Sequence, residues 1–392
     1  MCSNPLISII ILNWNGWEDT IECLESVYQL NYPNYNVIVL DNDSHDDSIQ
    51  KINEYAKGKI NLKSNFFEFD QINKPIKVFD FINSKNKSGK FNSEISDLES
   101  KKKLILISND KNYGFTEGNN IGIRFALKSL NQDYILIINN DTVVNKDLLK
   151  KLVSASILDD NIGLTQAKLL YYSYPEIINT TGNMMDKYGA FQSRGWKETD
   201  NLQYDKLVNE GFFYASGACT LINVEFILKL GIKEFFDTKF FAYHEDIDIS
   251  WIARLLGYKI IYCPDAICYH KEGNSIQKSA SLLMTYLSFK NNIRMLIKNY
   301  SIKNLIWILP SAIAIDAIIS ILASIRNRKI KYFIFFIKAC LWNIIFLPDS
   351  IRKRKIIQSK RELKDVDLFN FMESGSIKIS QIFKTIQSVF YD

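Results

Sequence analysis

The chain has 392 residues, of which 47% are hydrophobic, and a formal net charge of +5. This length suits two domains or one large α/β domain with appendages, and the apolar content supplies a sizeable core. Six cysteines without a CxxC pair or zinc-ligand spacing argue against a zinc domain and favour a reduced, cytosolic chain. Because the first residues carry neither a basic leader nor a small-residue cleavage site, we expect no signal peptide.

The beginning of the chain predicts a βαβ unit with a parallel sheet. Residues 6–12 are an apolar run of strand length, and residues 17–30 place apolar side chains at helical spacing. A second strand of buried type at 36–40 and a helix near 46–56 follow, which repeats the order of strand and helix.

Residues 57–103 interrupt this pattern. They are rich in Lys, Asn and Ser and follow no consistent period, so we expect a surface insertion, partly disordered. The regular pattern then resumes. The further expected elements are a strand at 103–108, a helix near 117–130, a strand at 134–138, a helix at 146–158, strand-like runs at 162–171 and 177–192, a return to the sheet over 211–224, a helix at 224–230 and a helical segment at 279–300.

The last part of the chain, 301–392, has a different character and is expected to form a helical region beside the domain 1–300. Residues 304–325 contain one ionisable side chain, Asp316, and are long enough to span a bilayer. Because Asp316, Ser320 and Ser324 recur every four residues, interfacial helices are the favoured interpretation, with a single span at 304–325 and a soluble core helix as alternatives. Residues 326–364 carry a local charge of +10, which favours an anionic membrane surface over nucleic acid, although a solvated basic helix also fits.

Polar residues collect where the predicted strands end. The four ends are Asn13-Trp14-Asn15, Asp41-Asn42-Asp43, Asn109 to Gly114 and Asn139-Asn140-Asp141. Ligands of open α/β sheets bind at the carboxyl ends of parallel strands, so these four ends predict one binding rim. A single such end would be explained by turns and helix caps.

Three carboxylates, Glu245, Asp246 and Asp248, stand within four positions in an aromatic setting. Burying them is costly unless protons, a metal or hydrogen-bond donors meet them, which indicates acid–base or metal chemistry. A helix N-terminus, where acidic side chains complement the dipole, is the alternative interpretation.

Asp141, after a strand and two amides, suits a hard divalent cation such as Mg²⁺ or Mn²⁺, and His270 is a candidate nitrogen ligand that equally fits a core or surface position. The sequence contains no Walker loop, and no GxGxxG follows the first strand, which weakens the nucleotide-hydrolase and dehydrogenase interpretations.

Five segments carry a resemblance to family 2 glycosyltransferases. They are ISIIILNWNG (7–16), VIVLDNDSHDDS (37–48), NYGFTEGNNIGI (112–123), ILIINNDTVV (135–144), and the block from SGACTLI (216–222) through FFDTKFFAYHEDIDISWIARLLGYKIIYCPDAICYH (235–270). In this order they resemble most the rhamnosyltransferase-like members. The resemblance implies an α/β fold of the GT-A (Rossmann-like) type, a nucleotide-diphospho-sugar transferase fold with a mixed, mainly parallel sheet, followed here by C-terminal hydrophobic or amphipathic helices.

The resemblance also implies roles for the residues at the matching positions. Trp14, with Asn13 beside it, would contact the nucleobase, Asp41 the base or ribose, and Asn112 and Asn140 the nucleotide sugar. Asn139-Asn140-Asp141 stands where the family has its DxD-type motif, and the neutral Asn139 replaces the first carboxylate. The implied metal ligands are Asp141, His270 and Asn139. The implied catalytic pair is Asp246, as general base, with Glu245.

The expected activity is therefore inverting transfer of a sugar from a nucleotide-diphosphate donor to a hydroxyl of a polysaccharide or lipid-linked glycan. TDP-rhamnose is the donor that the resemblance favours, and the cofactor is a divalent metal, Mg²⁺ or Mn²⁺. Expected partners are the donor, the acceptor and, through the C-terminal region, the cytoplasmic side of the cell membrane, but no nucleic acid. A non-catalytic sugar-nucleotide-binding or scaffold protein is the alternative, since Asn139 and Ile252 depart from the family pattern. A nucleotidyltransferase would share the rim but leaves the carboxylate block unexplained.

Overall fold

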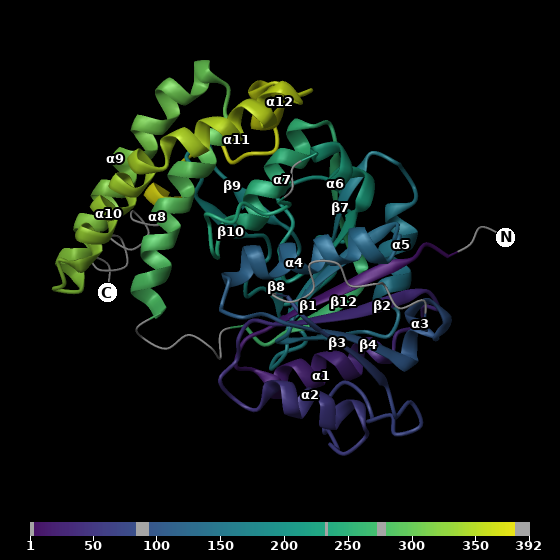
Figure 1. Cartoon of the computed structure of the whole chain (residues 1–392). Helices are drawn as coiled ribbons and strands as arrows, with labels where there is room; N and C mark the ends of the chain where they lie inside the picture. The colour runs from purple at the N-terminus through teal and green to yellow at the C-terminus, as the bar shows by residue number, and fades with distance from the viewer. Residues whose placement is uncertain (1–3, 84–93, 232–233, 273–279, 381–392) are drawn as a thin grey trace.

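The computed structural model describes residues 4–83, 94–231, 234–272 and 280–380, and shows an α/β domain with a layer of helices beside it (Figure 1). The strands of the ten-stranded sheet are, in spatial order, β3 (Lys77–Ile82), β4 (Lys103–Ser108), β2 (Tyr35–Asp41), β1 (Ile7–Asn13), β5 (Tyr134–Asn139), β11 (Cys219–Asn223), β7 (Ile162–Tyr171), β12 (Lys259–His270) and β6 (Thr142–Val144), with β8 (Ile178–Thr180) paired to β7. A separate two-stranded sheet contains β9 (Asn183–Met185) and β10 (Phe191–Ser193).

The first five strands of that order, β3 to β5, are parallel, whereas β11 runs antiparallel to both of its neighbours. β12 is parallel to β7, and β6 is antiparallel to β12. The sheet is therefore mixed and mainly parallel, which confirms the predicted fold class.

The helices follow the predicted alternation with strands and then form the C-terminal layer. They are α1 (Trp17–Tyr28), α2 (Ser48–Ala56), α3 (Glu94–Asp97), a short 3₁₀ helix (Ser100–Lys102), α4 (Gly114–Ser129), α5 (Leu148–Ser156), α6 (Val224–Leu230), α7 (Glu245–Leu255), α8 (Ala280–Asn299), α9 (Ile302–Arg326), α10 (Lys331–Ile345), α11 (Leu347–Ser359) and α12 (Asp365–Phe369).

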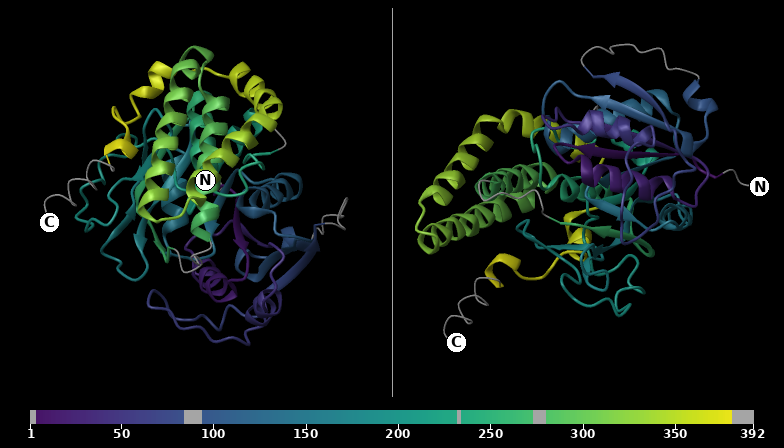
Figure 2. Two further views of the ribbon diagram at one scale, coloured as in Figure 1. Left: turned by 90° about the vertical axis from the view of Figure 1, so that its left-hand side faces the viewer. Right: turned by 90° about the horizontal axis from the view of Figure 1, so that it is seen from below.

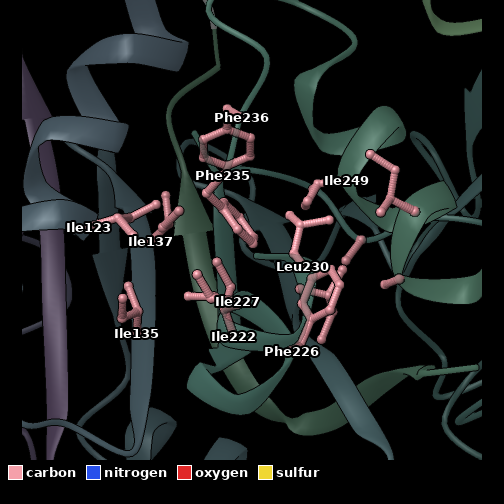
Figure 3. Close-up of a cluster of buried hydrophobic side chains, with 14 of the residues drawn as sticks. Ile123, Ile135, Ile137, Ile222, Phe226, Ile227, Leu230, Phe235, Phe236 and Ile249 are labelled. Carbon is pink, nitrogen blue, oxygen red and sulfur yellow. The ribbon is translucent and has the colours of Figure 1, made fainter. Parts of the chain in front are cut away.

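Two apolar cores lie on the two faces of the sheet, because successive side chains of a strand point to opposite faces. Ile9 and Ile11 of β1 pack in the core shared with α1, α2 and α5, whereas Ile10 packs in the core shared with α4, α6 and α7. Figure 3 shows part of the second core, where Phe235 and Phe236 lie close to Ile123 and Ile137. Each fully buried aliphatic or aromatic side chain of this kind contributes about 1.5–3 kcal/mol.

The segment 57–103, predicted to be a surface insertion that is partly disordered, contains an edge strand of the main sheet. β3 pairs in parallel with β4 over its whole length, so the prediction is wrong for Lys77–Ile82. The sequence gives little signal of this strand, because Phe79 is its one buried residue and an edge strand with half of its residues exposed shows little hydrophobic pattern. Residues 84–93 of the predicted insertion lie outside the described residues.

The C-terminal helices form a layer that returns to the α/β domain. Figure 2 shows α8, α9 and α10 side by side, with the α9–α10 hairpin projecting away from the sheet. The chain then comes back through α11 and α12. Arg294 of α8 binds Asp349 at 2.6 Å, and the Arg254 guanidinium lies 4.1 Å from the Phe371 ring centroid. Residue 279 and residues 381–392, which belong to the predicted helical segments, lie outside the described residues.

Helix α9 is the one described helix that is long and apolar enough to cross a membrane, and α10 with α11 passes the same criterion only as a pair bent by 65°. The polar stripe predicted in α9 faces inward, since Asp316 and Ser320 are buried. Asp316 forms an ion pair with Lys378, and its other oxygen accepts a hydrogen bond from Asn292 at 3.5 Å. The outward faces of α9 and α10 carry exposed isoleucine and leucine side chains together with Trp307.

Candidate active site

The four predicted strand ends lie at one edge of the sheet, as expected for neighbouring parallel strands. Asn13 stands opposite Asp41, and Leu12 stands opposite Asn139. The backbone N–H of Asn109 donates to the carbonyl of Asp41 at 2.9 Å, which brings the third strand end alongside.

A chain of hydrogen bonds joins the side chains of this rim. Asn13 Nδ2 donates to Asp41 Oδ1 at 2.7 Å, and Asn13 Oδ1 accepts from Thr20 Oγ1 at 2.8 Å. Thr20 Oγ1 in turn accepts from Asn140 Nδ2 at 3.1 Å. The second oxygen of Asp41 accepts the backbone N–H of Ser44 at 3.0 Å, so Asp41 closes its turn as well as facing the rim. Asn13 and Asp41 are buried and held by these hydrogen bonds. They therefore form a rigid base beneath the rim, here called the Asn13–Asp41 floor.

Trp14 differs from its buried neighbours because 55% of its surface is exposed. An aromatic ring of this size at the end of a central strand leaves a large apolar face open to a planar ligand. Its position agrees with the nucleobase contact that the resemblance implies.

Asn112 shapes the turn at the third strand end. Its Oδ1 accepts from Asn42 Nδ2 at 2.9 Å and from the N–H of Gly114 at 2.8 Å. Gly114 has φ +73°, and a Cβ there would lie 2.5 Å from the carbonyl oxygen of Phe241, so only glycine fits. The turn is thus held against the loop that precedes α7.

Asp141, His270 and Asn139 offer oxygen and nitrogen atoms that fit a divalent cation. His270 Nε2 lies 3.3 Å from Asp141 Oδ1, and the buried Oδ1 of Asn139 has no hydrogen-bond partner among the described residues. A carboxylate, an amide oxygen and an imidazole suit Mn²⁺ or Mg²⁺, provided that substrate phosphates complete the coordination. Within the described residues, no cluster of three His, Cys, Asp or Glu side chains is placed to hold a metal by itself.

In the pair formed by Asp141 and His270, each group favours the ionised form of the other. Burial raises the pKa of Asp141, but the hydrogen bond and charge of His270 outweigh it, so the pKa lies below its usual range. Burial lowers the pKa of His270, and the Asp141 carboxylate reverses that effect and brings it above its usual value. Asp141 is therefore kept ionised, as a metal ligand requires, whereas His270 would release its proton on binding a metal.

The carboxylate block begins helix α7, so the helix N-terminus and the reactive-site interpretations are both compatible with the structure. Asp246 is partly exposed, and its oxygens accept backbone N–H groups from Gly217 at 3.3 Å and from Ile247 at 2.9 Å. Glu245 is buried, and within the part of the chain that the structure describes its Oε2 has no hydrogen-bond partner.

Burial also sets the protonation of these two carboxyl groups. It raises the pKa of Asp246 to about 6, against the opposing hydrogen bonds from Gly217 and Ile247. Burial and the neighbouring charge of Asp246 raise the pKa of Glu245 well above its usual value. At neutral pH Asp246 is thus the ionised member of the pair, with a proton affinity close to that of an efficient general base.

Two adjacent residues connect Asp246 to the end of β5. The N–H of Asn139 donates to the carbonyl of Ala218 at 2.9 Å, while the preceding residue, Gly217, donates its N–H to Asp246. The candidate metal ligands at the end of β5 and the candidate base, Asp246, therefore lie at the same rim, although about a hundred positions separate them in the chain.

Asp248 and Arg254 have structural partners. Asp248 binds Lys298 of α8 at 2.6 Å and accepts from Asn299 Nδ2 at 2.9 Å. Arg254 donates to the carbonyls of Phe212 and Phe213, and burial lowers its pKa to about 9. Asp248 thus fastens α7 to α8.

Several residues of the site gave little signal in the sequence. Thr20 bridges Asn13 and Asn140 from the second turn of α1, and Gly217 acts through its backbone. Asn42 donates to Asn112 and accepts from Asn109 Nδ2 at 3.1 Å, so it ties two strand ends together. Its place in the Asp41-Asn42-Asp43 run was the available signal.

Known proteins resemble the chain over most of its α/β domain. Residues 77–284 match the family model described as glycosyltransferase like family 2, and residues 8–74 match that of glycosyl transferase family 2. The low-salt glycan biosynthesis hexosyltransferase Agl10 of Haloferax volcanii is 25% identical over 202 residues. That match covers 51% of this chain and 62% of Agl10, so the chain spans less than two thirds of this relative.

Solved structures share the fold at low sequence identity. The crystal structure of GalNAc-T7 with UDP, GalNAc and Mn²⁺ has a TM-score of 0.50 and 14% identity, covering 88% of this chain and 58% of that one. The mannosyltransferase PcManGT from Pyrobaculum calidifontis in complex with GDP-Man and Mn²⁺ has a TM-score of 0.46 and 12% identity, covering 92% and 86%. With the fold, the rim and the family match in agreement, the chain has the GT-A fold and belongs to glycosyltransferase family 2.

Proposed function

We propose that the protein is an inverting, metal-assisted glycosyltransferase that moves a hexose from a nucleotide-diphosphate donor to a hydroxyl of a glycan or lipid-linked acceptor. The observation that supports the proposal most is the pair of backbone hydrogen bonds made by Gly217 and Ala218, here called the Gly217-Ala218 bridge. These bonds connect Asp246 to the strand end that holds Asn139 and Asp141. The similarity to a glycan biosynthesis hexosyltransferase and to a structure with UDP, GalNAc and Mn²⁺ supports the substrate class.

The residues of the rim divide the work of such a transfer. Trp14 and the Asn13–Asp41 floor would bind the nucleoside, and Asp141, His270 and Asn139 would hold the cation. When bound, the cation stabilises the negative charge of the leaving diphosphate. Asp246 would accept the proton of the acceptor hydroxyl as its oxygen attacks the anomeric carbon from the face opposite the diphosphate. TDP-rhamnose remains the donor predicted from the resemblance.

The C-terminal helices support a location at the membrane surface. The exposed apolar side chains of α9 and α10 form a patch on the described chain, and patches of this kind mark membrane or protein contacts. Arg326, Arg328, Lys329 and Lys331 are exposed where the two helices meet. Each such charge adds about 1 kcal/mol of attraction to an anionic leaflet. Lys353 and Arg361, by contrast, are engaged in internal ion pairs.

A donor screen tests the proposed reaction. Nucleotide sugars, including TDP-rhamnose, are assayed with Mn²⁺ by thermal shift, and each binder is then assayed for release of nucleoside diphosphate in the presence of glycan and lipid-linked acceptors. Asp246→Asn should retain donor binding and lose nearly all turnover. Wild-type turnover in Asp246→Asn would refute the assignment of the base, and donor binding by the wild type without turnover on any acceptor would favour a scaffold protein.

A further inference from the structure

The loop before α7 adopts a strained backbone just ahead of the candidate base. Phe241, Tyr243 and His244 have φ angles of 69°, 66° and 71°, in the left-handed region that non-glycine residues rarely adopt. His244 is the N-cap of α7, and Glu245 and Asp246 follow directly. Such a conformation persists only when surrounding contacts over-determine it.

The side chain of one residue in α8, Asn291, meets this loop at three carbonyl groups. Asn291 Nδ2 lies within hydrogen-bonding distance of the carbonyl oxygens of Phe240 (3.2 Å), Ala242 (2.8 Å) and Tyr243 (2.7 Å). Asn291 is completely buried. The two hydrogens of its amide group are therefore shared among three carbonyls that no sheet or helix of the described chain supplies with backbone donors.

The remaining carbonyl of the loop is held from the opposite side. The oxygen of Phe241 accepts the backbone N–H of Thr116 at 3.1 Å, and Thr116 lies in the first turn of α4, next to the Asn112–Gly114 turn. The loop is thus fixed between the side of the rim that carries Asn112 and the C-terminal helical layer.

Ion pairs to α8 fix both ends of the same segment. Asp237, which precedes the loop, binds Arg294 and Lys298 at 2.8 Å each, and Asp248, which follows it, binds Lys298 at 2.6 Å. Because these pairs already attach α8 to the domain, the three carbonyl contacts of Asn291 are not needed merely to dock the helix. They specify the path of residues 240–243.

We propose that Asn291 is a positioning residue for the transfer reaction, which sets the direction in which Asp246 points by holding the carbonyls of Phe240, Ala242 and Tyr243. The inference rests on the proposed function. Helix α8 would then help to position the candidate base, although in the sequence it follows β12, the strand that ends at His270. Loss of the Asn291 donors would let the strained residues relax and turn the start of α7.

The test compares Asn291→Ala with Asn292→Ala in the full-length chain. Asn292 is the matched control, because it is a buried asparagine of the same helix whose amide donates to Tyr188 and Asp316 instead of the loop. We expect Asn291→Ala to lower kcat about 100-fold, the effect of a displacement of about 1 Å, with the donor KM changed by less than about threefold. Asn292→Ala should keep kcat close to that of the wild type.

Hydrogen–deuterium exchange supplies a readout that needs no substrate. In Asn291→Ala the amides of residues 240–248 should exchange at least about tenfold faster than in wild type, with the rest of the α/β domain unchanged, and Asn292→Ala should leave that segment protected. Should Asn291→Ala not fold, Asn291→Ser, which keeps one donor, is assayed by the same two criteria.

Equal kcat in Asn291→Ala and Asn292→Ala would overturn the positioning role. Faster exchange spread through α8 and the sheet would also overturn it, since Asn291 would then only stabilise the fold. A wild-type chain that turns over no nucleotide sugar would refute the proposed function and this role together. Undiminished turnover in Asn291→Ala, with an active wild type, would refute the positioning role alone.

Discussion

Replacing Asp246 by Asn should stabilise the protein while abolishing turnover. Burial raises the pKa of Asp246 from the ordinary 3.8 to about 6, which means that the folded protein holds the ionised carboxylate at a cost. Asn has nearly the same shape and carries no charge. The charge of Asp246 also helps to raise the pKa of Glu245, so its removal makes the Glu245 carboxyl group easier to ionise.

The pKa values give the size of the effect. One pKa unit corresponds to about 1.36 kcal/mol, so the change from 3.8 to about 6 corresponds to roughly 3 kcal/mol at neutral pH. This is an upper value, because Asp246 is partly exposed and its two backbone hydrogen bonds to Gly217 and Ile247 favour the charged form. A gain of this order would raise Tm by roughly 5 °C in a domain of this size.

The pH dependence follows from the sign of the shift. Because the folded pKa is raised, the stability that protonated Asp246 contributes is fully present below pH 3.8 and is lost as the pH rises through about 6. The amide that replaces this carboxyl group in Asp246→Asn cannot ionise. The difference in unfolding free energy between variant and wild type should therefore be largest near pH 8 and shrink as the pH falls toward 4.

Urea unfolding of both proteins at pH 4.5, 6 and 8, followed by tryptophan fluorescence, measures this difference, and nucleoside diphosphate release measures turnover. Asp133→Asn, at an exposed carboxylate away from the rim, is the matched control for a lost charge. A difference in unfolding free energy that does not change with pH would show that burial does not raise the pKa of Asp246, and would count against its role as base.

Three further results are expected. Asp141→Asn should weaken Mn²⁺-dependent binding of the donor by about 10- to 100-fold in calorimetry, since a carboxylate ligand is lost, and unchanged metal dependence would contradict its assignment. Trp14→Ala should raise the donor KM with little effect on kcat, because the proposed contact of the ring with the nucleobase would be the same in ground and transition states, and a selective loss of kcat would refute that role. Substituting Ile325 and Ile337 together by Glu should reduce flotation with anionic vesicles at least about 100-fold, whereas Ile72→Glu on the α/β domain should not.

The membrane test uses point substitutions because the C-terminal helices do not separate cleanly from the α/β domain. The backbone N–H of Glu362 donates to the carbonyl of Leu255 at 2.7 Å, and Lys353 binds Asp237 at 2.7 Å. A deletion from residue 304 would remove these contacts and leave Arg254 without the Phe371 ring. Loss of membrane binding after such a deletion would then be confounded with loss of the fold.

The strand ends were predictable from the sequence, whereas their connection to Asp246 was not. Parallel strands of buried type bring their carboxyl ends to one edge, so Asn13, Asp41 and Asn139 had to lie together once the strands were recognised. The bridge to Asp246 runs through backbone atoms of Gly217 and Ala218, whose positions depend on β11 pairing antiparallel with β5. No side-chain pattern encodes that pairing. The contact of Asn291 with the loop before α7 was not predictable for a related reason. Polar residues on an amphipathic helix are normally expected to face solvent.

The orientation of α9 shows how a periodic pattern can be recognised and still leave its direction open. Asp316, Ser320 and Ser324 mark one stripe, but the period alone does not say whether water or protein lies beside it. In the structure Asp316 meets Lys378 and Asn292, which come from parts of the chain on either side of α9, so the polar stripe is buried and the isoleucines face outward. Exposing that surface to water is unfavourable, since apolar burial contributes about 25 cal/mol per Å². Covering the outward face with another apolar phase would stabilise this arrangement, which is the physical reason for proposing a membrane contact there.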